Sequence, residues 1–447
     1  MLRLTADWAL LDDGFAPDVD ITVQDGVISH VSREGGAGER VAGVVLPGMA
    51  DLHSHAFQRV FAGLTAHSGG GGDFWSWRDA MYRAAAGMTP ELYAPVVAYL
   101  GKELLKGGYT SLAEFHYVHR DPAGAPYGNP VAMAEAVFAG AGEAGIGLTL
   151  LVGLYETAGF AGAPLSDAQR RFRAGADEAL AMADALAATH GGGVGLALHS
   201  LRAVPPETLA RVVPAFTARH PAAPIHIHVA EQRAEVEACI ATNGAPPIAW
   251  LLDNAPVDHR WCLVHATHGT AAELQAAART GAVAGLCPTT EADLGDGLFE
   301  LPAWLGAVGA FGIGSDSNVT LDALAELRLL EWGQRLGLQR RNVTASADKP
   351  CGRALWQGAA LGGAAACGVE GGRIAAGCRA DLVVLQATPE SAALGPDFAL
   401  DAAVFAAASR PVRHVMAGGE WVVRDFAHRN EAAIDAAYAV ALKALAA

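Results

Sequence analysis

Eight short apolar runs, separated by amphipathic stretches, constrain the fold more than any other feature of the sequence. Most of the runs have the length of one buried strand, and such an alternation is typical of repeated βα units that share a parallel sheet. The runs cover residues 44–55, 111–116, 147–155, 193–199, 224–229, 260–265, 282–287 and 310–316. Because eight βα units can close on themselves, we predict an α/β fold with a TIM-like (β/α)8 barrel over residues 48–371.

The two ends of the chain have a different pattern. Residues 20–31 contain two alternating segments joined by a turn, and segments 377–385 and 412–424 also resemble strands. An alanine-rich helical segment follows the last of them. We therefore expect residues 1–47 and 372–447 to form one small β-sandwich domain with a C-terminal helix.

Composition excludes two classes of partner. Lysine and arginine number 31 against 47 aspartate and glutamate residues, so the formal net charge is −16 and the surface repels nucleic acid. Although 52% of the residues are hydrophobic, no run of about 18 uninterrupted apolar residues is present, and we expect no membrane span.

The expected compartment is the cytoplasm. Asp7, Asp12 and Asp13 stand where a secretory signal would need a continuous apolar stretch. The six cysteines form no CxxC pair, so we expect all of them to be reduced.

Two histidines, His53 and His55, stand two residues apart at the end of the first apolar run. Side chains two apart on a strand point to the same face, so both imidazoles could ligate one metal ion. This spacing alone does not decide between a metal site and ordinary polar residues.

Polar residues that could bind a metal recur at the ends of five further runs: His116, His199, His228, His265 and Asp316. A barrel gathers the carboxyl ends of its strands at one face, where active sites lie. Imidazole nitrogens with one carboxylate suit zinc or another divalent ion and leave a position open for water. For His116 we weigh two roles, fixing the tautomer of a ligand and ordinary packing.

Glu231 stands three residues beyond His228, just past the end of its strand. A carboxylate there can reach a water molecule at the metal site and move protons. His226 has the same strand parity as His228, and we expect it to be a buried spacer rather than a ligand. His119 and His268 are followed by loop residues, so we expect them to be solvated.

This pattern resembles the mononuclear deaminase branch of the amidohydrolase superfamily. The resemblance rests on HxH at the first run, a histidine with HxxE at the fifth, a histidine at the sixth and an aspartate at the eighth. The stretches LPGMADLHSH (46–55) and GRIAAGCRADLVVL (372–385) are also similar to that superfamily, so the resemblance spans nearly the whole chain.

The resemblance implies a mononuclear metal site. His53, His55, His228 and Asp316 would hold one zinc ion per chain, with iron or another divalent ion as the alternative. A binuclear member would usually need a bridging lysine at an inner strand end. The four lysines are all expected on helices, in loops or in the tail: Lys102, Lys106, Lys349 and Lys443.

Four longer stretches are similar to the formimidoylglutamate deiminases of this superfamily: HAFQR (55–59), FWSWR (74–78), EFHY (114–117) and HSLR (199–202). The resemblance implies hydrolysis of N-formimidoyl-L-glutamate to N-formyl-L-glutamate and ammonia, a step of histidine degradation.

The implied roles divide between substrate binding and catalysis. Arg78 and Arg202 would bind the carboxylates of this small anionic substrate derived from an amino acid, because guanidinium groups bind carboxylates bidentately. Further hydrogen bonds would come from Gln58, Tyr117 and His199. The catalytic residues would be His265 and Asp316, which accept the proton of the attacking water, and Glu231, which protonates the leaving nitrogen.

Alternative functions remain at this point. Another mononuclear-zinc aminohydrolase could act on a guanine-like or adenosine-like heterocycle stacked on Trp75 or Trp77, but two arginines fit a diacid better. A ligand sensor without catalysis would not need Glu231, His265 and Asp316.

A purely structural zinc site would usually have four protein ligands, often cysteines, and only Cys287 lies at a predicted strand end. We also expect a homodimer, because the chain is large and rich in apolar residues.

Overall fold

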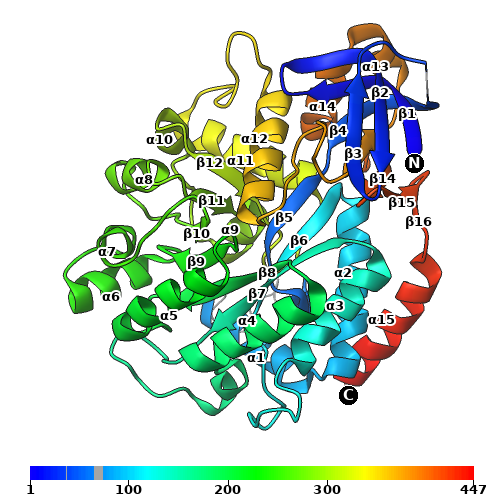
Figure 1. Cartoon of the computed structure of the whole chain (residues 1–447). Helices are drawn as coiled ribbons and strands as arrows, with labels where there is room; N and C mark the ends of the chain where they lie inside the picture. Colours follow the sequence, from blue (N-terminus) through cyan, green and yellow to red (C-terminus); the bar gives the residue numbers. More distant parts are fainter. Residues whose placement is uncertain (37, 65–73, 447) are drawn as a thin grey trace.

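The computed structural model describes residues 1–36, 38–64 and 74–446, and within them eight parallel strands form a closed barrel (Figure 1). The strands follow the order of the sequence around the barrel, and β12 pairs with β5 to close it. They are β5 (Met49–Ser54), β6 (Tyr109–His116), β7 (Gly147–Leu154), β8 (Val194–Ser200), β9 (Ile225–Val229), β10 (Trp261–His265), β11 (Val283–Leu286) and β12 (Ala310–Ile313). The predicted barrel is confirmed.

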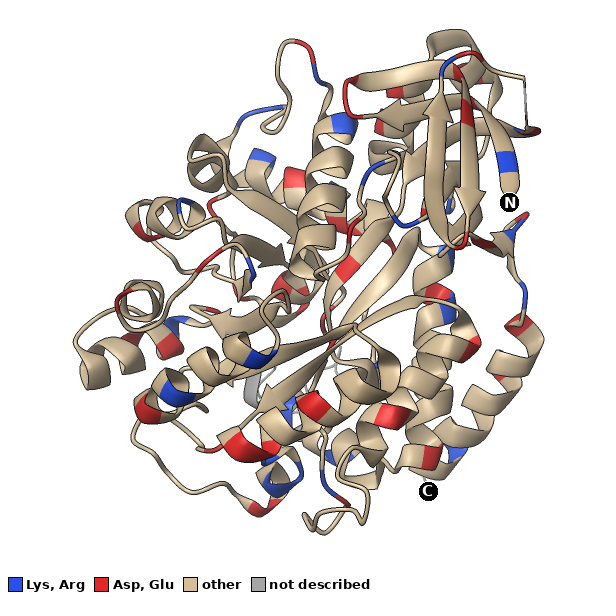
Figure 2. Cartoon of the chain, in the orientation of Figure 1, with Lys and Arg blue, Asp and Glu red and all other residues tan. Residues whose placement is uncertain are grey.

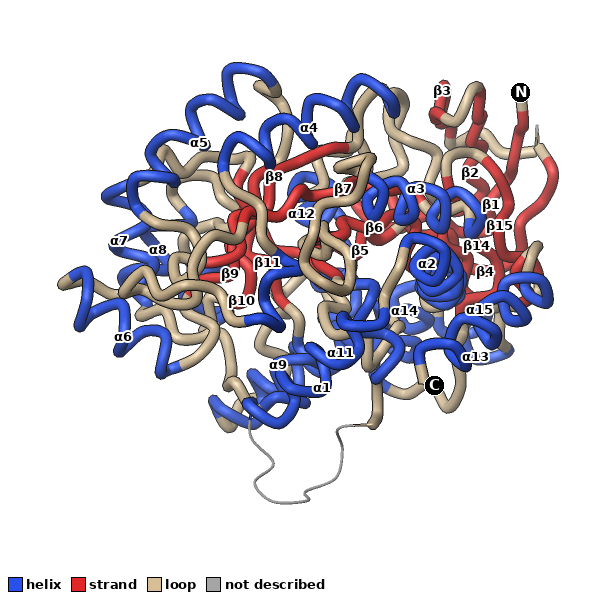
Figure 3. Tube along the Cα trace, turned by 90° about the horizontal axis from the view of Figure 1, so that it is seen from below, coloured by secondary structure: helices blue, strands red, loops and turns tan. Residues whose placement is uncertain are grey.

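Helices surround these strands, as Figure 3 shows. They are η1 (Ala56–Phe61), α1 (Phe74–Gly87), α2 (Pro90–Lys106), α3 (Ala132–Ala144), η2 (Asp167–Phe172), α4 (Ala176–His190), α5 (Pro206–Arg219), α6 (Arg233–Asn243), α7 (Pro247–Asn254), α8 (Ala271–Ala278), α9 (Pro288–Leu294), α10 (Leu301–Gly306), α11 (Ala323–Leu338) and α12 (Cys351–Ala366). Local sequence fixes several of their starts. Thr270 and Glu273 form a reciprocal capping box at α8, and Pro90 occupies the first turn of α2.

Strands from both ends of the chain build a separate mixed sheet, as predicted. They are β1 (Leu2–Leu11), β2 (Gly14–Gln24), β3 (Val27–Ser32), β4 (Glu39–Pro47), β13 (Leu382–Leu385), β14 (Val412–Ala417), β15 (Glu420–Arg424) and β16 (Ala427–His428). The order of the sheet is β16-β15-β14-β13-β4-β1-β2-β3, so β4 and β13 join the two halves. The remaining helices are α13 (Pro389–Leu394), α14 (Pro396–Phe405) and α15 (Glu431–Leu445).

The prediction of a single strand over residues 44–55 is wrong, because the segment divides at Gly48 into β4 of the mixed sheet and β5 of the barrel. The Gly48 amide donates to the carbonyl of Asp381 at 2.9 Å, directly after the last residue pair of β4 and β13, and the chain then enters the barrel. A Cβ at this position would lie 2.3 Å from Oγ1 of Thr110 and 2.6 Å from Cβ of Asp381. The chain therefore changes sheets where a glycine lets two other segments approach its backbone.

The C-terminal helix α15 packs along α2, beside it in Figure 1. Lys102 pairs with Asp435, and the rings of Tyr99 and Tyr438 stack with centroids 3.9 Å apart. Lys106 pairs with Glu431 in the same interface. The remaining lysines lie between α11 and α12 and on α15, so the four lysines occupy helices or loops as predicted.

Charged residues lie mainly on the outer helices and loops (Figure 2). All six cysteines are buried and unpaired. Among the described residues, no helix combines the length and the apolar character needed to cross a membrane.

Close packing of α12 on β12 gives a test of the fold. A Cβ at Gly362 would lie 2.0 Å from the Phe311 carbonyl oxygen, so Gly362→Ala should push the helix off the barrel and destabilise the protein by about 1–3 kcal/mol. At the exposed helical Gly142, where a Cβ would meet nothing within 4 Å, Ala should stabilise by about 0.5–1 kcal/mol. Denaturant unfolding measures both changes, and equal effects would contradict this packing.

Candidate metal centre and active site

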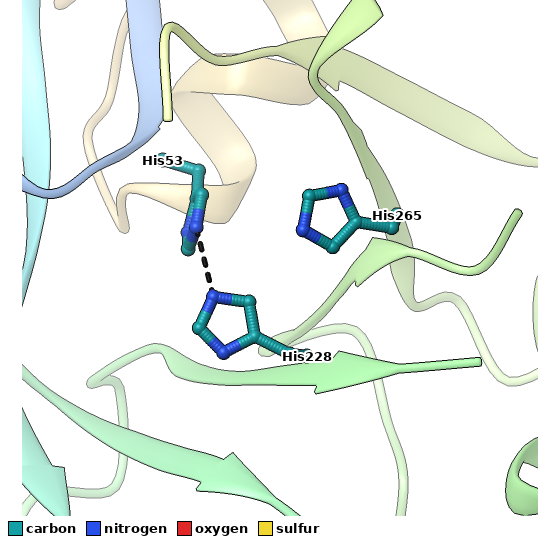
Figure 4. A group of neighbouring side chains, drawn as sticks. All are labelled: His53, His228 and His265. Carbon is teal, nitrogen blue, oxygen red and sulfur yellow. Dashed lines mark hydrogen bonds between the residues drawn. The ribbon is translucent and has the colours of Figure 1, made fainter. Parts of the chain in front are cut away.

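Three imidazoles and a carboxylate converge inside the carboxyl end of the barrel. Nε2 of His228 on β9 lies 3.0 Å from Nε2 of His53 on β5 and 3.3 Å from Nε2 of His55. Oδ1 of Asp316, three residues beyond β12, lies 3.4 Å from Nε2 of both His53 and His55. Figure 4 shows His53 and His228 pointing toward each other, with His265 from β10 beside them. The structure thus brings the four predicted ligands together.

The hydrogen bonds behind these rings indicate that a cation belongs between them. Nδ1 of His55 lies 3.0 Å from the Phe115 carbonyl, and Nδ1 of His228 lies 2.7 Å from the His199 carbonyl. A carbonyl only accepts, so both Nδ1 atoms carry hydrogen and both Nε2 atoms present lone pairs to each other. Tetrahedral ligands at 2.0–2.1 Å from zinc are separated by about 3.3–3.4 Å, close to the separations seen here. The residues fit a divalent ion.

Burial keeps these imidazoles neutral. Desolvation lowers the pKa of His53 and of His228 well below the ordinary value, and it also lowers the pKa of His55. Neutral imidazole is the form that ligates metal, so the dry end of the barrel prepares these side chains for that role.

Left-handed backbone conformations occur where the chain leaves the barrel strands around the cluster. Ala230, His265, Asp316 and Asn318 have φ of 51°, 65°, 45° and 62°. The Asn318 side chain donates to the carbonyls of His55 and Asp316, which holds this strained turn in place. Such strain concentrates at functional sites.

The predicted proton-transfer residues flank the cluster. Nε2 of His265 lies 3.8 Å from Oδ2 of Asp316. Glu231, two residues past β9, forms an ion pair with Arg202 at 3.4 Å, and its backbone amide donates to the carboxylate of Glu235. The ion pair of its side chain with Arg202 and the hydrogen bond of its backbone to Glu235 therefore hold Glu231 in position.

A cavity of about 120 Å³ opens onto the cluster. It is lined by every predicted catalytic and substrate-binding residue and by three of the four predicted ligands: His55, Gln58, Arg78, Tyr117, His199, Arg202, His228, Glu231, His265 and Asp316. The fourth ligand, His53, lies fully buried beneath them. A larger cavity of about 570 Å³ lies between α12 and the mixed sheet, away from these residues.

The substrate-binding candidates come from different elements. Gln58 on η1 donates to the Tyr117 hydroxyl at 3.2 Å, and the His199 ring lies against Tyr117 and Tyr155. Arg78 on α1 lies over the ring of Tyr82. Of the two tryptophans considered for stacking, Trp77 lines the cavity, whereas the side chain of Trp75 is outside the described residues.

Four other histidines lie outside the ligand cluster. His226 is a buried spacer, as expected, with Nε2 2.8 Å from the Ala366 carbonyl, and His268 is half-buried. The expectation of a solvated His119 is wrong, because it is buried and bonds the Gly153 carbonyl. His116 fixes no ligand tautomer: its nitrogens have no hydrogen-bond partner among the described residues.

Three residues of the site were not predicted from the sequence. Oε1 of Glu291 lies 3.3 Å from Nδ1 of His265. Tyr155 and Gln169 line the cavity and are joined by a 2.9 Å hydrogen bond. Glu291 is an acid in the first turn of α9, which in sequence is indistinguishable from a helix-capping acid.

Imidazoles and a carboxylate at the strand ends of a parallel barrel, with acid–base groups beside them, are the arrangement of a metal-dependent hydrolase. The amidohydrolase family model matches residues 44–422, and the chain belongs to that family. Members of the family use a divalent metal ion.

Relatives agree with this assignment. The chain is 47% identical to a formimidoylglutamate deiminase of Pseudomonas aeruginosa over 96% of each chain. An amidohydrolase structure from Brucella melitensis superposes with a TM-score of 0.94 at 44% identity and covers the whole of both chains. A zinc-containing adenosine deaminase structure from Xanthomonas campestris, 22% identical, shows the same fold with a TM-score of 0.82 over 100% of this chain and 98% of that one.

Metal analysis of a matched pair of variants tests the ligand set. We expect about one ion per wild-type chain, loss of the ion in His228→Gln, and retention in His226→Gln, because the His226 ring bonds a carbonyl away from the cluster. Elemental analysis of the purified proteins measures this. Two ions per chain, or equal loss in both variants, would refute the assignment.

Proposed function

We propose that this chain hydrolyses N-formimidoyl-L-glutamate to N-formyl-L-glutamate and ammonia, with one zinc ion per chain. The observation that carries the proposal is the pairing of two arginines, Arg78 and Arg202, with the ligand cluster in one small cavity. The name and high identity of the Pseudomonas relative support the same substrate.

His53, His55, His228 and Asp316 would hold the zinc ion. Three imidazole nitrogens with one carboxylate oxygen favour zinc or another borderline divalent ion over the harder calcium or magnesium. When bound, such an ion polarises water and lowers its pKa from about 15.7 toward about 7, which makes a nucleophile available at neutral pH.

The residues of the chain move the protons. As the new carbon–oxygen bond forms at the formimidoyl carbon, His265 and Asp316 accept a proton from the attacking water, and Glu231 gives one to the imine nitrogen. Collapse of the tetrahedral adduct breaks the carbon–nitrogen bond and releases ammonia. Over the cycle both water protons end on the departing nitrogen, and the water oxygen becomes the formyl oxygen.

The substrate carboxylates would be held by Arg78 and Arg202, and its other polar groups by Gln58, Tyr117 and His199. Local charge decides this binding, because screening at physiological salt acts over about 8 Å and the net charge of −16 is felt weakly inside a cavity. Guanidinium groups fit carboxylates in a fixed fork, so they orient the diacid as well as attract it.

The setting is proposed to be histidine degradation in the cytoplasm, without nucleic acid or membrane partners. Six buried, unpaired cysteines are typical of a reducing compartment. We also propose a homodimer. Trp332 and Leu336 on α11 and the neighbouring Leu298 expose apolar surface that a second copy could cover.

Ammonia release by the zinc-loaded protein tests the substrate. We expect N-formimidoyl-L-glutamate to be hydrolysed with kcat/KM of about 10⁴ M⁻¹s⁻¹ or more, and N-formimidoyl-L-aspartate, guanine and adenosine to be much poorer. Release from a heterocycle alone would replace the proposal with the alternative aminohydrolase function. No release from any of the four would favour a ligand sensor.

Glu231→Gln tests the proton transfer. The amide cannot donate an acidic proton, so kcat should fall by about 10²–10⁴-fold while the metal content stays unchanged. Steady-state ammonia release together with elemental analysis measures both. Wild-type turnover in this variant would exclude Glu231 as the proton donor.

A further inference from the structure

The imidazoles of the cluster differ in what lies behind them. The Nδ1 atoms of His55 and His228 face the backbone carbonyls of Phe115 and His199. Nδ1 of His265 instead faces a carboxylate oxygen, Oε1 of Glu291, at 3.3 Å. A carbonyl orients a neutral ring, whereas a carboxylate also stabilises a ring that acquires a proton.

Glu291 is itself held in position. Its Oε1 accepts a 2.9 Å hydrogen bond from the backbone amide of Cys287, at the start of α9. The side chain is buried, and its hydrogen bonds fix where the carboxylate meets the His265 ring. The other ring nitrogen of His265 points toward Oδ2 of Asp316 at 3.8 Å, so the ring spans the distance from Glu291 to the cluster.

We infer that Glu291 is a positioning residue for the hydrolytic step, which it serves by fixing the ring and tautomer of His265. A carboxylate accepts hydrogen from Nδ1, so in the neutral ring it is Nε2 that carries the lone pair, on the side where water attacks. When that water gives its proton to Nε2, the Nδ1 hydrogen stays in its bond to Glu291, and the carboxylate balances the new charge. Glu291 gains and loses no proton.

The kinetic test of this role rests on the proposed function, because it uses the proposed substrate. The role itself is the same for any substrate that the site takes. Any substrate attacked by water at this cluster needs the same proton acceptor. Histidine ring protons can also be observed without substrate. Failure of the substrate assignment and failure of this inference are therefore distinguishable.

The experiment compares Glu291→Gln and Glu291→Ala with the wild-type metalloprotein in ammonia release from N-formimidoyl-L-glutamate. The amide oxygen of Gln can still accept both hydrogen bonds, so the fold and ring orientation persist while the charge is lost. We expect kcat to fall by about 10²-fold in Glu291→Gln and further in Glu291→Ala, with KM within about threefold and the metal retained.

Glu326→Gln is the matched control. Glu326 is also a fully buried carboxylate that anchors the first turn of α9, since it accepts from the amide of Thr289 at 2.9 Å, and no described contact joins it to His265. Burial raises its pKa well above the ordinary value, so the neutral amide is a close substitute. We expect kcat within about threefold of wild type.

Proton NMR of protein labelled with ¹⁵N in histidine observes the ring hydrogens directly. If Glu291 had only a structural role, the signal of the His265 Nδ1 hydrogen would not change in its variants. The Nδ1 hydrogen of His265, assigned with His265→Asn, should resonate far downfield, disappear in Glu291→Ala and persist in Glu326→Gln. An unchanged signal in Glu291→Ala would overturn the inference. So would wild-type kcat in Glu291→Gln, equal losses in Glu291→Gln and Glu326→Gln, or loss of the metal from either Glu291 variant.

Discussion

The seam that closes the barrel between β12 and β5 is the constraint on which the candidate site depends. Buried Asp51 accepts the amide and the hydroxyl of Ser315, while the amide of Asp316 donates to the His53 carbonyl and the amide of His55 donates to the Asp316 carbonyl. These bonds set the register of the two segments that carry three of the four proposed ligands. Closing the barrel and assembling the ligand set are therefore one event, and a slip of one residue would turn a ligand to the wrong face.

Hydrogen bonds around the strand ends offset the cost of unfavourable backbone conformations and of buried histidines there. Each non-glycine residue in a left-handed conformation costs on the order of 1–3 kcal/mol, and several occur in this region. Buried neutral histidines add the cost of desolvation. Hydrogen bonds from Asn318 and from the strand carbonyls hold these conformations and fix the orientation of the ligand rings. Such preorganisation favours a tightly bound, slowly exchanging metal.

Much of the site could be predicted from the sequence because its residues stand at, or a few positions beyond, the ends of predicted strands. The HxH pair, His228, His265 and Asp316 each needed only a strand boundary and the topology of a barrel. Gly48 and Glu291 could not be predicted in this way. The break at Gly48 depends on Asp381, more than 300 residues away, and the role of Glu291 depends on a turn that brings α9 beside β10. Local periodicity carries no information about such contacts.

The mixed sheet has a consequence for synthesis on the ribosome. β4 pairs with β1 on one side and with β13 on the other, and β13 is made about 330 residues later. At 5–20 residues per second, β4 remains an open edge for roughly 20–70 s, while the barrel emerges and folds beside it. β4 is thus made well before its partner β13, and its second edge stays unpaired until the sequence of the whole barrel has been made.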